Sequence, residues 1–201
     1  MAIDQSALLL DLERALVARN VRAGFTLLEK TVGKSGRLDI KRPEAISFFL
    51  CMAQWTDLGY RDLAFFDGLC DVSSIDRAQL SMLDFLRLKM TEAFRCLAGE
   101  NIEEAVGLLD IVIRAGEDLL PEYLVFLANF WKGRAHRKQG EYEQAILHIA
   151  AARSAAERAK APRLVAVTKI HESWLAFQRG DRRRAFLLLD EAEEELRPTG
   201  H

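Results

Sequence analysis

Apolar residues recur every three to four positions along most of this chain. The stretches 8–20, 79–98 and 143–159 show this spacing most clearly, and they are rich in residues that favour helices. A sustained alternation of apolar and polar residues, which is typical of half-buried strands, is absent from the sequence. The pattern therefore predicts an all-α protein.

A small residue recurs in this pattern at intervals of 40 or 41 residues, and an apolar residue follows it each time. Small residues followed by apolar ones predict a helical turn that packs closely against a neighbour through its buried face. The small residues are Gly24, Ala64, Ala105, Ala145 and Ala185, and their apolar followers are Phe25, Phe65, Val106, Ile146 and Phe186.

Glycines and prolines punctuate the same period. Glycine upstream of the small residue suits a tight turn, because it accepts a positive φ without a Cβ clash. Proline downstream marks where a second helix must stop. We therefore expect a single domain, 1–201, made of helix-turn-helix units over approximately 5–43, 44–84, 85–124, 125–164 and 165–201. The glycines are Gly59, Gly99, Gly140 and Gly180, and the prolines are Pro43, Pro121, Pro162 and Pro198.

The stretch KQGEYEQAI, from Lys138 to Ile146, resembles the turn and second helix of a tetratricopeptide repeat. Gly133 matches the small residue of that repeat's first helix, and Gly140, Tyr142, Ala145 and Ala152 match its turn, aromatic and small positions. The longer spacing of about 40 residues looks like the variant found in sensor regions of some bacterial transcription regulators. The resemblance implies an α-α superhelix, a tetratricopeptide-like solenoid of about five repeats.

By this resemblance the first helices line a concave groove that binds a protein or peptide partner. The sequence alone leaves a second interpretation open, in which the same residues are core. A groove of apolar anchors with two arginines suits a peptide that carries hydrophobic and acidic side chains. The predicted partner-binding residues are Phe49, Met90, Phe94, Phe130, Arg134, Arg137, Ile170, Trp174 and Phe177.

Composition and charge narrow the function without identifying it. The chain has 201 residues, 50% of them hydrophobic, and a net charge of -2, so no global field would collect nucleic acid or anionic lipid. Asp4, Asp11 and Glu13 interrupt the N-terminus where a signal peptide needs an apolar core, which favours the cytoplasm. We expect no membrane association and no direct binding of nucleic acid.

Catalytic patterns are weak in this sequence. His136, His148 and His171 are isolated, with no pair four residues apart that would make a zinc helix, and no nucleophile with a neighbouring base is visible. We therefore expect a non-catalytic scaffold without a metal or cofactor. The alternatives are a domain of a larger bacterial transcriptional regulator that senses a ligand or peptide, and an enzyme with an atypical site between helices.

The fifth unit raises two further expectations. Arg179, Arg182, Arg183 and Arg184 crowd its turn, where positive charge opposes the helix macrodipole, so an acidic partner competes there with a plain solvated helix start. The unit also has more apolar surface than one neighbouring repeat can cover. This surplus predicts either a homodimer through the C-terminal repeat or a chain that is part of a longer polypeptide.

Overall fold

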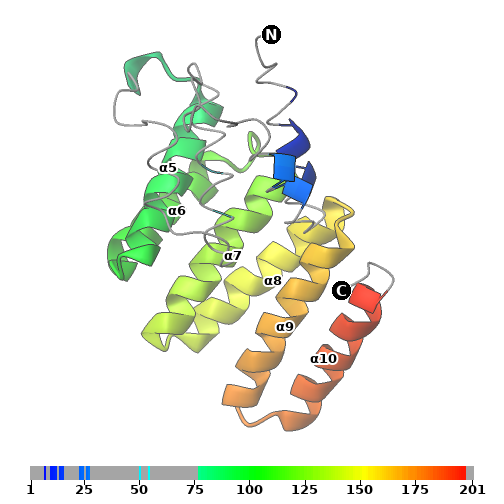
Figure 1. Ribbon diagram of the computed structural model, residues 1–201. Helices are drawn as coiled ribbons and strands as arrows, with labels where there is room; N and C mark the ends of the chain where they lie inside the picture. Colours follow the sequence, from blue (N-terminus) through cyan, green and yellow to red (C-terminus); the bar gives the residue numbers. More distant parts are fainter. Residues whose placement is uncertain are drawn as a thin grey trace. The chain divides into compact units, whose positions relative to one another are not determined.

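In the computed structural model, the described residues are 77–197 together with the isolated helical positions 7, 10–12, 14, 15, 23, 24, 26, 27, 50 and 54 (Figure 1). No strand occurs among these described residues, so the all-α prediction is confirmed for them. Their elements are η1 (Arg77–Gln79), α5 (Met82–Ala98), α6 (Ile102–Ala115), α7 (Glu122–Gln139), α8 (Tyr142–Arg158), α9 (Pro162–Gln178) and α10 (Arg182–Leu196).

The chain divides into two compact units, Met1–Arg95 and Cys96–His201. In the second unit, α6 to α10 follow one another in space as they do in sequence, each running antiparallel to the one before (Figure 1). Packing is most extensive within the pairs α7–α8 and α9–α10, and α8 then packs on α9 and α6 on α7. This arrangement of successive helix pairs agrees with a helical repeat.

Two of the predicted glycine turns have the expected backbone. Gly140 lies between α7 and α8 with φ 78°, and Gly180 lies between α9 and α10 with φ 83°. At each turn the next residue's N–H reaches back into the finished helix, with Glu141 donating to the His136 carbonyl at 2.9 Å. In the turn after α5, however, the positive φ falls on Glu100, at 62°, rather than on Gly99.

The small residues of the period lie at the contact between paired helices. Ala105, Ala145 and Ala185 are all buried, on α6, α8 and α10. Opposite Ala145, a Cβ added to Gly133 would lie 2.8 Å from the Ile149 side chain and 3.3 Å from the Ala145 carbonyl oxygen. The pair α7–α8 is therefore close enough at this point that only glycine fits without a shift.

Prolines mark the start of the first helices as well as the end of the second ones. Pro121 is the residue just before α7, and Pro162 is the first residue of α9. Proline suits the beginning of a helix because the N–H that it lacks would have no partner there. The helix pairs consequently start three residues before the predicted repeat boundaries at 125 and 165.

A polar network is enclosed between α6, α7 and α8. The Lys132 ammonium donates to the Asp110 carboxylate at 2.6 Å, and the His148 Nδ1 lies 3.0 Å from the Asn129 side-chain oxygen. The rings of His136 and His148 stack, with centroids 5.5 Å apart. Burial, followed by the nearby charges of Lys132 and His136, lowers the pKa of His148 to about 4.

Replacing Gly133 by valine should destabilise the protein by about 1–3 kcal/mol, because the added methyl groups overpack the contact with Ile149. Gly107→Ala on α6 is the matched control. A Cβ there meets nothing within 4 Å, so better helix propensity should stabilise by about 0.5–1 kcal/mol. Urea unfolding measures both changes, and equal stability of the two variants would contradict the close approach.

The free energy of unfolding should fall as the pH drops from about 6.5 to about 4. The unfolded chain protonates His148 near its ordinary pKa, whereas the folded chain resists protonation, so acid favours the unfolded state in this window. His148→Gln removes this titration. The free energy of unfolding, measured with urea, should therefore fall less between pH 7 and pH 4.5 in the variant than in the unmodified protein. An identical fall in both proteins would show that His148 contributes nothing.

Candidate functional site

Side chains from α7 and α9 meet on one face of the Cys96–His201 unit. We call this group the arginine–aromatic face and define it as Arg134 and Arg137 on α7, His171 and Trp174 on α9, and Tyr142 at the start of α8. These residues lie together because α7 and α9 are the first helices of successive pairs, and α8 holds them side by side.

Arg137 on α7 contacts two aromatic side chains of α9. Its guanidinium carbon lies 4.8 Å from the centroid of the Trp174 ring, and its Nη1 donates to the His171 Nδ1 at 3.4 Å. Tyr142 meets the Trp174 ring edge-on, with the ring centroids 5.8 Å apart. The arginine is therefore held by aromatic and imidazole groups, which leave its positive charge uncompensated.

The electrostatics of Arg137 support this description. The guanidinium is half-buried, and among the described residues it forms no ion pair with a carboxylate. Burial lowers its pKa, and the positive charge of Arg134 lowers it further. A half-buried cation next to a second cation is costly unless an anion approaches it.

The partner-binding residues predicted from the sequence differ in their contacts and in their exposure. Arg137 lies over the Trp174 ring, and the charge of Arg134 acts on Arg137. Ile170 and Phe177 lie on the same helix as Trp174 and are exposed, Phe177 by 50%. Phe130, by contrast, is only 3% exposed, because it stacks on Phe126 and meets the edge of His171. For Phe130 the core interpretation is the one that its burial favours.

The remaining predicted residues lie elsewhere. Met90 and Phe94 are buried on α5, in residues assigned to the unit Met1–Arg95, and Phe49 lies outside the described residues. Sequence reasoning missed His171 and Tyr142 as members of the face. His171 precedes Trp174 by three positions and so shares its side of the helix, which was the available signal.

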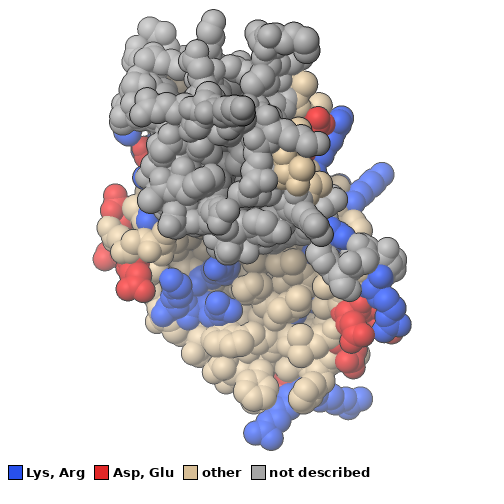
Figure 2. Space-filling model, viewed as in Figure 1, with Lys and Arg blue, Asp and Glu red and all other residues tan. Residues whose placement is uncertain are grey.

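Basic side chains also group on the molecular surface near the arginine–aromatic face. Figure 2 shows a group of basic side chains over α7, beside a surface with few charged groups in the lower half of the view. Within 77–197 and the isolated helical positions, no three His, Cys, Asp or Glu side chains are grouped in a way that could hold a metal ion. The same residues contain no helix long and apolar enough to cross a membrane.

The chain was also compared with known proteins. No family model, no curated protein and no solved structure matches it.

Two substitutions should separate core from surface on this face. Phe130→Ala empties a buried site and should cost about 3–5 kcal/mol of stability. Arg137→Met should change stability by less than about 1 kcal/mol, since it loses a cation–π contact but also removes a half-buried charge. Urea unfolding measures both values, and a loss at Arg137 as large as that at Phe130 would mean that the arginine is a structural residue.

Proposed function

We propose that this protein is a non-catalytic binding module, built as a stack of tetratricopeptide-like helix pairs. Its arginine–aromatic face binds a segment of a partner protein that carries a carboxylate beside apolar side chains. The succession of antiparallel pairs α7–α8 and α9–α10, with their first helices on one side, supports the repeat architecture.

The observation that carries the proposal is the uncompensated charge of Arg137. Its guanidinium lies on the Trp174 ring and has no acidic partner among the described residues. A planar guanidinium binds a carboxylate with two parallel hydrogen bonds, and a site that excludes water strengthens them. A carboxylate from a partner would therefore supply the opposite charge that Arg137 lacks among the described residues.

Apolar side chains beside the arginines supply the second half of the recognition. Ile170, Trp174 and Phe177 follow one another along one face of α9, and each is more than a third exposed. Aromatic and aliphatic groups spaced by three or four residues are the usual anchors for a bound peptide. The expected ligand thus places an acidic residue at Arg137 and apolar residues along α9.

Selection from a displayed library of random peptides tests this function. The unmodified protein should enrich peptides with Asp or Glu next to apolar residues. The double variant Arg134→Gln and Arg137→Gln should bind a selected peptide at least about tenfold more weakly, because it loses charge-assisted hydrogen bonds. Trp174→Ala should weaken binding as well, and added salt should weaken binding to the unmodified protein.

Arg183→Gln is the matched control, because it removes one exposed arginine from α10 without touching the arginine–aromatic face. It should bind the selected peptide as the unmodified protein does. Enrichment of peptides without acidic residues, or equal binding by the double variant, would contradict the proposal. Circular dichroism and urea unfolding of each variant confirm that the fold is retained.

A further inference from the structure

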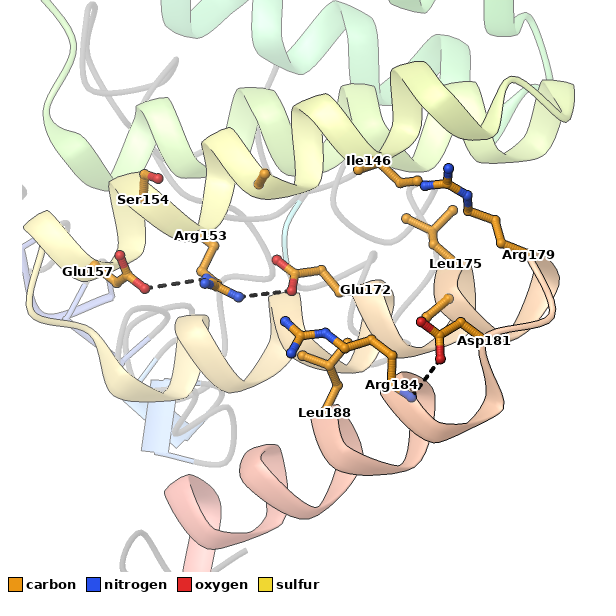
Figure 3. A pocket seen from close by; sticks show the side chains of 12 residues that line it. Ile146, Arg153, Ser154, Glu157, Glu172, Leu175, Arg179, Asp181, Arg184 and Leu188 are labelled. Atoms are coloured by element: carbon orange, nitrogen blue, oxygen red, sulfur yellow. Dashed lines mark hydrogen bonds and ion pairs between the residues drawn. The ribbon is translucent and has the colours of Figure 1, made fainter.

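A second concave region lies away from the arginine–aromatic face, between α8, α9 and α10. It is a cavity of about 460 Å³, a size that suits a small molecule. Ile146 and Ala150 on α8, Leu175 and Ala176 on α9, and Leu188 on α10 give it apolar walls. Figure 3 shows charged side chains from all three helices around this apolar centre.

The acidic groups of the cavity are already engaged. Glu172 and Glu157 both pair with the Arg153 guanidinium, at 2.9 Å and 3.3 Å. Asp181 caps α10 by accepting a hydrogen bond from the Arg184 backbone N–H at 2.9 Å. No carboxylate of the cavity therefore remains for a ligand cation without breaking one of these contacts.

Two of the basic groups are held less tightly. The Arg184 side chain extends toward Glu172 in Figure 3, and its charge acts on Glu172 and Glu191, but among the described residues it forms no ion pair within 4 Å. Among the described residues, Arg179 forms an ion pair with Glu143 alone, at 3.2 Å, and both side chains are more than half exposed. Exposed pairs of this kind contribute at most about 1 kcal/mol, so Arg179 can exchange its partner easily.

The four arginines at the turn between α9 and α10 do not all lie in the cavity. Arg179 and Arg184 line the cavity, whereas Arg182 and Arg183 do not. The N-terminus of α10 adds the positive end of its macrodipole at the same place. The cavity consequently combines an apolar interior with three arginines and three carboxylates, and Arg179 and Arg184 lie at the end next to the start of α10.

We propose that this cavity binds a small amphipathic carboxylate, with its acid group at Arg184 and Arg179 and its apolar part against Leu175, Leu188 and Ala150. The site is independent of the arginine–aromatic face, and it would make the protein responsive to a small acid as well as to a protein partner.

Three matched probes test the charge preference: 4-phenylbutyrate, its neutral amide and 4-phenylbutylamine. They share an apolar part and differ in charge. The carboxylate should bind with a dissociation constant on the order of 1 mM, as expected for so small a ligand, and shift the backbone amide NMR signals of Ala150 and Ala176. The amide and the amine should bind at least about tenfold more weakly.

Paired variants locate the site. Arg184→Gln should weaken binding of 4-phenylbutyrate about tenfold, while Arg183→Gln and Arg137→Gln should leave it unchanged. Ala150→Phe should block the cavity, and the exposed neighbour Ala151, which does not line it, provides the control Ala151→Phe. The Ala150 pair keeps the test valid if Arg184→Gln disturbs the fold.

Several results would overturn the proposal. Absence of binding, equal binding of all three probes, or tighter binding of the amine would exclude a carboxylate site. Loss of binding with Arg183→Gln as well as Arg184→Gln would indicate a general effect of charge. Loss with Arg137→Gln alone would assign the probe to the arginine–aromatic face, and would leave the peptide-binding function to be judged by its own selection experiment.

Discussion

The close contact between α7 and α8 at Gly133 is the constraint on which the described architecture depends. A side chain at this position would collide with Ile149, so the two helices pack closely there. The left-handed turn at Gly140 then returns the chain directly along α7. Helix α7 also contacts α9, through Phe130 and Arg137, which both meet His171.

Charge is distributed unevenly over this scaffold, and the distribution distinguishes structural from available groups. Lys132 is buried and paired with Asp110, and Lys169 is paired with both Glu191 and Glu195. Arg137 and Arg184 lack such partners among the described residues, and each lies beside apolar surface. The paired charges link neighbouring helices, whereas an arginine beside apolar groups and without an ion pair among the described residues is suited to bind an anion.

The two proposed sites use opposite parts of the helix pairs. The arginine–aromatic face is formed mainly by the first helices, α7 and α9, whose side chains meet directly. The cavity lies between the second helices, α8 and α10, with α9 between them. Helix α9 contributes to both, with Trp174 on the arginine–aromatic face and Glu172 and Leu175 in the cavity.

Helical periodicity, the 40-residue interval and the glycines were enough to predict the all-α class and the turns at Gly140 and Gly180, because these features depend on local backbone preferences. The resemblance to a tetratricopeptide repeat added the expectation that Arg134, Arg137 and Trp174 face one groove. The sequence did not predict which of the apolar side chains on the first helices are exposed. Phe130 and Ile170 occupy equivalent positions, yet one is 3% and the other 41% exposed. His171 reaches over Phe130 from the next pair, and only the packing of the pairs decides which side chain is covered in this way. The same holds for the cavity, where only the packing of α8 against α9 brings Glu172 to Arg153, which also pairs with Glu157.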